Sequence, residues 1–258
     1  MTFMTCRGGW PQSVGRTDKI ALLQAYDYVE ALIHADLTRV DGIKRNPKRV
    51  QRLLQSYARN QGTSANYGVI YSDIKTNDDS SLSTASIASY ILALKKMFVV
   101  EDMTTWNPNL RSKTAVRSAD TRYFVDPSIA AAALNLSPKD LANDLHSFGF
   151  LFETLCVRDL RVYAQALGGT VYHYRDRNGL ECDAIIHLPN GSYGLVEIKL
   201  GGAEAMESAA RALCKLESII DLEKMKPPSF KMVLVGVGEY AYVRSDGIFV
   251  VPVGCLRD

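Results

Sequence analysis

The sequence lacks any long hydrophobic run, and no apolar stretch approaches the roughly 20 residues that span a bilayer. Its first residues also lack the charged and then apolar pattern of a secretory signal peptide. Both absences argue against a membrane or secreted protein. We therefore expect a soluble globular protein in the cytoplasm, with no membrane partner.

Cysteine is scarce, and no CxxC pair occurs. The five cysteines are scattered over the chain: Cys6, Cys156, Cys182, Cys214 and Cys255. This pattern is typical of reduced core residues rather than of disulfides or zinc ligands. Histidine is equally rare, and the four residues His34, His146, His173 and His187 include no pair at metal-binding spacing. We interpret each histidine as an ordinary surface or core residue.

Size and charge set broad limits on the fold and on partners. A chain of 258 residues with 47% hydrophobic content has room for one large domain or two ordinary ones. The net charge is only +2, but the segment from Ile43 to Val125 holds 13 Lys and Arg against 6 Asp and Glu, a balance of +7. Such a basic segment can attract phosphate backbones, although it can also serve solubility.

The first part of the chain predicts helices followed by a β-hairpin. Helical patterns cover 18–40, 47–62 and 84–96, a weaker segment covers 67–75, and short strands are expected at 97–100 and 121–125. In the last of these helices, Tyr90 and Lys95 are expected to face outward. In the first helix, the residues spaced for one face are Ile20, Leu23, Tyr26, Val29, Leu32 and Leu37. Three helices and a hairpin make a winged helix, in which the last helix can enter the major groove of DNA. The candidate nucleic-acid contacts are Lys95, Lys96, Arg111, Lys113 and Arg117. A winged helix used only for protein contact or as a spacer is the alternative.

The stretch from Leu180 to Leu200 predicts a β-hairpin that gathers charged groups. Its Asn190-Gly191 pair is a strong hairpin signal. If pairing is centred on Asn190, Asp183 lies directly opposite Glu197, and Lys199 follows on the same face. Opposed side chains stand roughly 5 Å apart at Cβ, so two ionised carboxylates would repel one another without a cation between them.

This hairpin therefore suggests a divalent metal site. Mg²⁺ prefers oxygen ligands and is often held by one or two carboxylates, with water and phosphate completing its shell. The alternative without a function is a solvated cross-strand ion pair. Apolar residues on both faces of the two strands favour the site, because a buried charge is costly without a partner.

A third acid lies upstream in a regular succession of elements. From Phe148 onward the patterns predict helix, strand, strand, strand, helix and strand, which makes a mixed sheet with helices packed on it, and a last strand is expected at 248–253. Glu153 shares a helical stripe with Val157 and Leu160, so we expect its carboxylate to point toward the sheet.

These residues carry a resemblance. The order αβββαβ with Glu153, Asp183, Glu197 and Lys199 resembles the PD-(D/E)XK superfamily of restriction-endonuclease-like nucleases. The whole chain is similar to the C-terminal part of bacterial and archaeal AAA-type ATP-binding proteins, with matching stretches at Gly8–Pro11, Arg122–Asp126, Gly149–Glu153, Arg175–Asp183 and Val196–Lys199. The resemblance implies an α/β protein with a helical winged-helix domain at 1–134 and a nuclease-like domain with a mixed sheet at 135–258.

The resemblance also implies roles for individual residues. Asp183 and Glu197 would bind Mg²⁺ or Mn²⁺, Lys199 would be the catalytic lysine, and Glu153 would be an auxiliary acid. Glu181, Arg175 and Arg211 are candidates to support this site or to contact substrate.

One departure from the family limits what can be carried over. The nucleotide-binding motif GxxxxGK[S/T] is absent, so no ATP site is expected, and an ATPase module is a possible partner outside this sequence. The leading hypothesis is a DNA-associated, metal-dependent phosphodiesterase. The alternatives are a non-catalytic module that binds DNA or a partner ATPase, and the tail of an ATPase whose activity lies wholly in a missing segment.

Overall fold

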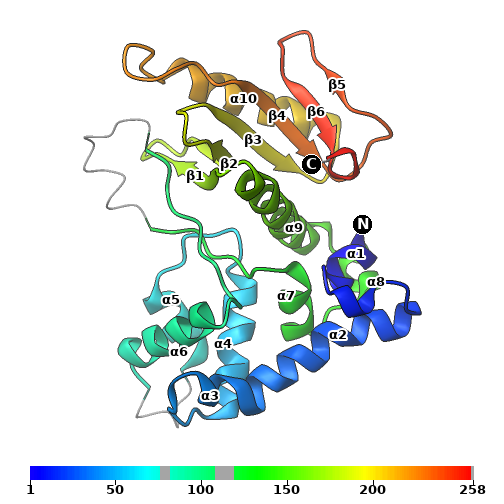
Figure 1. The fold of residues 1–258 in the computed structure, drawn as a ribbon, viewed down its shortest axis with the longest axis vertical. Helices are drawn as coiled ribbons and strands as arrows, with labels where there is room; N and C mark the ends of the chain where they lie inside the picture. The colour runs from blue at the N-terminus through cyan, green and yellow to red at the C-terminus, as the bar shows by residue number, and fades with distance from the viewer. Residues whose placement is uncertain (76–81, 108–118, 257–258) are drawn as a thin grey trace. The chain divides into compact units, whose positions relative to one another are not determined.

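The computed structural model describes residues 1–75, 82–107 and 119–256. They form two compact units, which Figure 1 shows with their helices and strands labelled. The first unit comprises Met1–Asp102 and Thr121–Thr154, and the second comprises Met103–Asp120 and Leu155–Asp258. Neither unit is continuous in sequence, whereas the expected domains, 1–134 and 135–258, are.

The first unit is helical. Up to residue 75 its elements are α1 (Thr2–Arg7), η1 (Pro11–Ser13), α2 (Asp18–Ala31), η2 (Leu32–Asp36), α3 (Leu37–Asp41), α4 (Pro47–Arg59) and α5 (Tyr67–Ile74). The helix predicted over 18–40 is therefore present, but the π-helical turn η2 interrupts it. A π-helical turn alters the regular spacing of side chains along a helix.

The predicted buried face of α2 is partly wrong. Ile20 and Leu23 are each 47% exposed, whereas Ala21, Ala25 and Val29 are buried. The reason lies in the partner of α2, which is the alanine-rich helix α7 (Pro127–Ala133). Small side chains on both helices allow their backbones to approach closely, so the larger residues face solvent.

The helices α4, α5 and α6 (Thr84–Lys96) begin at side-chain caps. Asn46 and Asn66 each accept two backbone N–H bonds, and Ser83 accepts the N–H of Ser86 at 3.1 Å. Each cap satisfies a donor that would otherwise lack a partner in the first turn. The predicted starts at Pro47 and after Ser83 are thus confirmed. Tyr90, which was expected to face outward, is buried beneath the guanidinium of Arg45.

The strands expected at 97–100 and 121–125 are wrong in extent. The two segments meet through one antiparallel bridge, between Val100 and Phe124. Two backbone bonds flank it, from Val125 to Val99 at 3.1 Å and from Glu101 to Tyr123 at 3.0 Å. Phe98 has a φ of 55°, which strand geometry does not allow, so regular pairing cannot extend through it. The residues 108–118 between the two segments lie outside the described part.

Asp102 is the centre of a buried network in the first unit. Its carboxylate accepts hydrogen bonds from Tyr57 and Arg122, and it pairs with Lys95 at 2.8 Å. Arg122 also donates to the carbonyl of Ala65 at 3.0 Å. The network joins α4 and α6 to the segment that follows residue 120.

The N-terminal segment is fixed to the start of α7. Asp126 caps that helix, and its Oδ2 accepts the N–H of Gly9 at 2.9 Å. The indole of Trp10 donates to Ser128 Oγ at 2.9 Å. Gly8 has a φ of 73°, and a Cβ there would lie 2.3 Å from Ser128 Oγ, so only glycine fits. The following helix α8 (Pro138–Asn143) begins with a capping box at Ser137.

The second unit is a six-stranded mixed sheet with helices. Its elements are the part of α9 (Leu145–Ala166) from Leu155 on, β1 (Thr170–Arg175), β2 (Glu181–His187), β3 (Tyr193–Lys199), α10 (Ala203–Ser218), β4 (Phe230–Val235), β5 (Tyr242–Val243), β6 (Phe249–Pro252) and η4 (Val253–Cys255). The strand order is β1-β2-β3-β4-β6-β5, and β4 runs parallel to both β3 and β6. The predicted order of helices and strands is confirmed, except that sequence reasoning missed the short strand β5.

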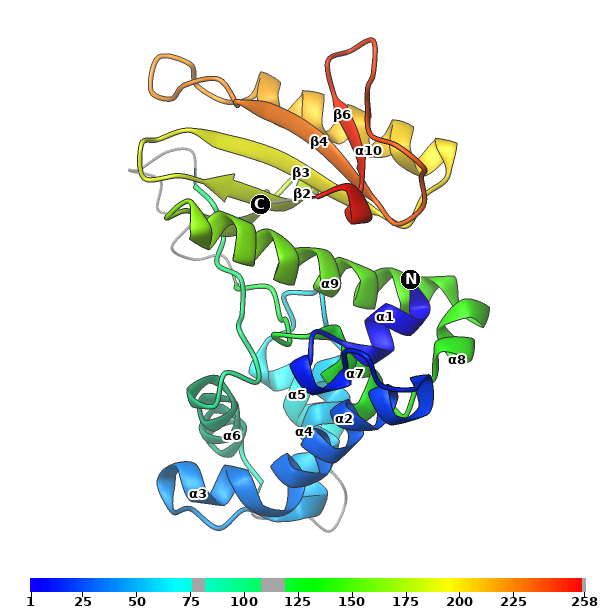
Figure 2. The ribbon, with the colours of Figure 1, turned by 45° about the vertical axis from the view of Figure 1, so that its right-hand side comes forward.

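Helix α10 covers one face of this sheet. Ala209, Leu213 and Leu216 on the helix belong to the same buried cluster as Leu195 on β3 and Val233 on β4. Figure 2 shows α10 lying along the strands, with the second-unit part of α9 on the opposite face. Both faces of the central strands are therefore covered, which explains their nearly continuous apolar sequences.

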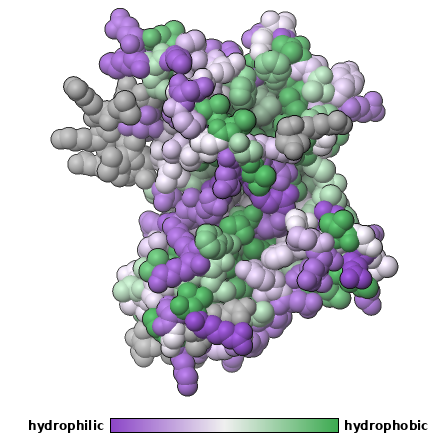
Figure 3. Space-filling model, in the orientation of Figure 1, coloured by the Kyte–Doolittle hydropathy of each residue, from purple (hydrophilic) through white to green (hydrophobic). Residues whose placement is uncertain are grey.

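No helix among the described residues is long and apolar enough to cross a membrane. On the face drawn in Figure 3, hydrophilic residues are interspersed with hydrophobic ones.

Candidate functional site

The hairpin formed by β2 and β3 has the register that the sequence predicts. Ala184 pairs with Val196, Ile185 with Leu195 and His187 with Tyr193, so pairing is centred on Asn190. Gly191 closes the turn with a φ of 80°, a conformation that glycine adopts without strain. This register brings Asp183 and Glu197 to the open end of the hairpin, just beyond the last strand pair, Ala184 and Val196.

A β-bulge lies at Asp183. On β1, Tyr172 pairs with Ile185 and Tyr174 pairs with Cys182, so one residue, His173, faces both Asp183 and Ala184. A bulge re-aims the side chains of the strand that carries the extra residue. At this bulge, Oδ2 of Asp183 accepts the backbone N–H of Ile198 on β3 at 2.7 Å. The carboxylate is thus fixed where the two strands stop pairing.

Three predicted site residues come together at this point. Lys199 Nζ lies 3.0 Å from Asp183 Oδ2 and 2.8 Å from Glu197 Oε2. Both carboxylates therefore direct an oxygen at a single cation position. The side chain of Glu197 is 6% exposed and that of Lys199 is 30% exposed, so the cluster is buried at its base and open at Lys199.

Two acids share one cation in this cluster, and this crowding shifts the pKa of its members. Burial, together with repulsion from Asp183, raises the pKa of Glu197 to about 8. Burial alone would lower the pKa of Lys199, but the charges of Asp183 and Glu197 outweigh it and raise that pKa. Glu197 therefore has a reduced tendency to ionise, while Lys199 stays charged.

Cys182 is a neighbour of the site that sequence reasoning assigned to the core. It is fully buried, and its Sγ lies 3.3 Å from the carbonyl oxygen of Val196. Burial, and then the charges of Glu197 and Asp183, raise the pKa of this thiol. A neutral, apolar group therefore closes the inner side of the cluster.

Residues 104–106 contact β1 beside the bulge. No periodic pattern in the sequence predicted this contact. Thr105 forms a parallel bridge to His173, and its Oγ1 lies 3.0 Å from His173 Nε2. The carbonyl of His173 accepts the N–H of Trp106 at 2.6 Å. Burial, and then the charge of Arg175, lower the pKa of His173 to about 4. His173 is a neutral core residue that holds β1 beside the bulge.

Glu153 belongs to the first unit. Tyr123 donates a hydrogen bond to its Oε1, and a Cβ on Gly62 would lie 3.1 Å from that oxygen. The carboxylate is thus packed against these two residues of its own unit. The expectation that Glu153 acts with Asp183 stays a prediction.

Three further candidates lie on exposed surface of the second unit. Arg175 and Glu181 form a cross-strand ion pair at 3.1 Å, and about half of each side chain is exposed. An exposed pair of this kind contributes little to stability. Arg211 is exposed on α10, close enough to Glu207 to lower the pKa of that acid, although Arg244 is the main cause of the shift. Their roles in a reaction stay predictions.

The predicted nucleic-acid contacts divide into two groups. Lys95 is held by Asp102, whereas Lys96 is exposed at the end of α6. Arg111, Lys113 and Arg117 lie outside the described residues. DNA contact by any of the five stays a prediction.

Asp183 and Glu197 are the residues suited to hold a metal. Among the described residues, no group of three or more His, Cys, Asp or Glu side chains could hold a metal ion. The pair of carboxylates nevertheless suits Mg²⁺ or Mn²⁺, because both oxygens face one cation position and such ions take their other ligands from water and phosphate.

Two families cover the chain in succession. Residues 2–140 match the domain of unknown function DUF8612, and residues 148–256 match the domain of unknown function DUF4143. DUF4143 is commonly found in the context of AAA-type ATPases. No curated protein matches the chain. The matches thus agree with a relationship to AAA-type proteins, while neither description names an activity.

Proposed function

We propose that this chain, which belongs to the family of the domain of unknown function DUF8612, is a DNA-associated, Mg²⁺-dependent phosphodiesterase. Its reaction site would be Asp183, Glu197 and Lys199. The observation that carries the proposal is the convergence of two carboxylate oxygens on one cation position at the open end of the β2–β3 hairpin.

Asp183 and Glu197 would hold the metal between them, and their positions are restrained. Asp183 is anchored by the N–H of Ile198, and Glu197 is buried in a central strand. When bound, Mg²⁺ would polarise a phosphate and activate a water molecule. A restrained pair of ligands suits this role, because preorganised charges need little rearrangement during the reaction.

Lys199 would act on the substrate once a metal neutralises the two acids. In the structure its ammonium bonds both carboxylates, and its side chain is more exposed than theirs. An ammonium freed from this pair can donate to a phosphate oxygen as negative charge develops there. Lys199 would therefore serve as the electrostatic partner of the scissile phosphate.

The first unit would supply the DNA contact. The order α4, α5, α6 and then an antiparallel pair of segments is the order of a winged helix, which supports this assignment. Lys96, exposed at the end of α6, is the candidate contact that we assign to a phosphate. Phosphate contacts of this kind give affinity without sequence preference.

The test is cleavage of supercoiled, linear and branched DNA with Mg²⁺ or Mn²⁺. We expect the wild type to cut at least one form, and Asp183→Asn and Glu197→Gln to lose at least a hundredfold in rate. Glu223→Gln, a matched change of an exposed acid in the same unit, should cut normally. Cleavage that survives both site variants would rule out this site.

A non-catalytic module that binds DNA or a partner ATPase is the second candidate. It is favoured by the fact that Lys199 already satisfies both carboxylates without a metal. A melting scan separates the two proposals, since a metal at a hundredfold excess over its Kd stabilises the native state by about 2.7 kcal/mol. No shift with Mg²⁺ or Mn²⁺, combined with DNA binding and no cleavage, would support the binding module.

A further inference from the structure

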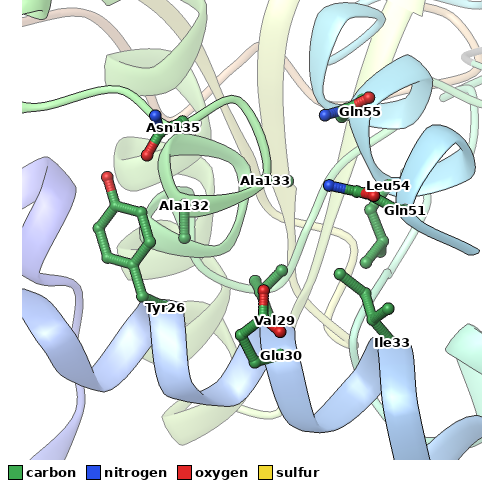
Figure 4. A pocket seen from close by; sticks show the side chains of 10 residues that line it. All are labelled: Tyr26, Val29, Glu30, Ile33, Gln51, Leu54, Gln55, Ala132, Ala133 and Asn135. Carbon is green, nitrogen blue, oxygen red and sulfur yellow. The ribbon is translucent and has the colours of Figure 1, made fainter. Parts of the chain in front are cut away.

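The first unit contains a pocket of about 350 Å³ between helices α2, α4 and α7. Figure 4 shows its lining, which comes from α2 and the turn that follows it on one side, α4 on another, and the end of α7 on the third. A pocket of this size falls within the range that holds small ligands. It lies within one unit and has no part in the proposed phosphodiesterase site.

The pocket has an apolar floor and a polar rim. Val29 and Leu54 in the floor are buried, whereas Glu30, Gln51 and Asn135 are exposed. Gln55 adds a second amide one turn along α4 from Gln51, about 6 Å away along the helix axis. In Figure 4 the polar ends of these side chains come from different sides of the hollow. This is the usual design of a ligand pocket, in which apolar contact gives area and a few polar groups give orientation.

Asn135 is held in a conformation that few residues adopt. Its φ is 56°, and the N–H of Leu136 bonds the carbonyl of Ala131 at 2.8 Å, which closes α7 with a left-handed C-cap. Glycine is the usual residue at such a position, and its lack of a side chain would leave this edge of the pocket bare. With Asn135 at this position, the cap instead places a side-chain amide at the pocket.

The charge of the lining selects the class of ligand. Among the ten described residues that line the pocket, Glu30 is the single acid, and none is Lys, Arg or His. Glu30 pairs with His34, whose Nε2 lies 3.3 Å away on an exposed surface and is charged only when protonated. Phosphates and carboxylates find no cation in this lining, so the pocket disfavours anions.

Tyr26 adds another acceptor and an aromatic ring. Its hydroxyl donates to the carbonyl of Leu136 at 3.2 Å, which leaves its oxygen able to accept from a ligand. The rim thus offers one carboxylate, three amide oxygens and one phenol oxygen. We propose that this pocket binds a guanidinium group, either of a small molecule or of an arginine side chain on a partner.

A guanidinium suits this lining better than an ammonium does. It presents five donors in one plane, so it can bond several acceptors that approach from different elements. It is also more weakly hydrated, and its flat faces or its methylene stem can lie on the apolar floor.

Calorimetric titration of the full chain tests the proposal. The probes are agmatine and acetyl-Ala-Arg-Ala-amide, with acetyl-Ala-citrulline-Ala-amide as the neutral match of the peptide. We expect one molecule of a guanidinium probe per chain, and at least tenfold weaker binding of the citrulline peptide. Tighter binding of the arginine peptide than of agmatine indicates a partner protein, and the reverse indicates a small molecule.

Two variants link the binding to this pocket without disturbing the fold. Glu30→Gln removes the charge of an exposed side chain and should weaken guanidinium binding at least tenfold. Asn135→Gly removes the amide while favouring the same backbone conformation, and should weaken binding severalfold. Glu223→Gln in the other unit should bind as the wild type does. The proposal is wrong if neither guanidinium probe binds, if citrulline binds equally well, or if Glu30→Gln leaves the affinity unchanged.

Discussion

The two units each contain a buried cluster of charges, but the clusters are balanced in opposite ways. In the first unit, the single acid Asp102 meets two cations, Lys95 and Arg122, and the hydroxyl of Tyr57. In the second unit, two acids, Asp183 and Glu197, meet the single cation Lys199. We call the first cluster balanced, because three side chains donate to its single acid, and the second cluster unbalanced, because its two acids share one cation.

The two clusters also differ in the group whose pKa they raise. Burial and the negative charge of Asp102 raise the pKa of Tyr57, so its proton stays in place to donate to that acid. In the second cluster the pKa of Glu197 rises to about 8 because no cation fully offsets its burial and its neighbour Asp183. The divalent ion that we propose would relieve this repulsion in the second cluster.

Removing the acid of the balanced cluster should have the largest effect. Asp102→Asn leaves the guanidinium of Arg122 buried without its counter-charge, and a broken buried pair costs about 3 to 5 kcal/mol. Unfolding of the first unit in urea, followed by its circular dichroism, should show this loss. A loss under 1 kcal/mol would mean that the network contributes little to the fold.

The unbalanced cluster should respond to pH instead. Because the folded pKa of Glu197 is raised, its contribution to stability is fully present below the unfolded value of 4.5 and is lost as the pH rises through about 8. The loss is on the order of 2 to 4 kcal/mol, since each pH unit changes the free energy of unfolding by at most about 1.4 kcal/mol per proton.

Glu197→Gln isolates this effect. The variant keeps the size of the side chain and cannot ionise, so its stability relative to the wild type should increase between pH 5 and pH 8. Urea unfolding at a series of pH values measures the difference. Parallel curves for the two proteins would contradict the raised pKa of Glu197.

The sequence predicted the hairpin cluster well because its signals are local. An Asn-Gly turn and a period of two set the register, and that register brings Asp183 and Glu197 to the same end of the hairpin. The bulge at Asp183 was not predictable, because it depends on His173 and on the Thr105 bridge across the sheet. Long-range pairing of that kind leaves no periodic signal in a single sequence.

The Asp102 network and the α2 face illustrate what local patterns miss. Lys95 reads as a solvent-facing residue at the end of a helix, and its partner Asp102 lies beyond that helix in a non-periodic segment. On α2, a pattern of large apolar residues predicted burial of Ile20 and Leu23. Both are exposed, because α2 packs its small residues against the alanines of α7. Both outcomes were set by the partner element rather than by the helix itself.

Removing Lys199, the cation of the unbalanced cluster, should destabilise the protein in a pH-dependent way. Lys199→Met leaves two carboxylates facing one another, so we expect a loss of about 2 kcal/mol at pH 8 and a smaller loss at pH 5, where Glu197 holds its proton. Mg²⁺ should restore more stability to this variant than to the wild type if the carboxylates form a metal site. Melting scans at both pH values, with and without Mg²⁺, measure these effects.

Removing a lysine from the balanced cluster should have the smallest effect on stability. Lys95→Met removes a cation whose side chain is 36% exposed, while Asp102 keeps its bonds to Arg122 and Tyr57. A partly exposed ion pair contributes roughly 0 to 1 kcal/mol, and we expect a loss in that range with no change between pH 5 and pH 8. Urea unfolding of this variant beside Lys199→Met compares the two lysines directly. A larger loss at Lys95 than at Lys199 would reverse the assignment of the balanced and unbalanced clusters, because it would show that Asp102 depends on both of its cations.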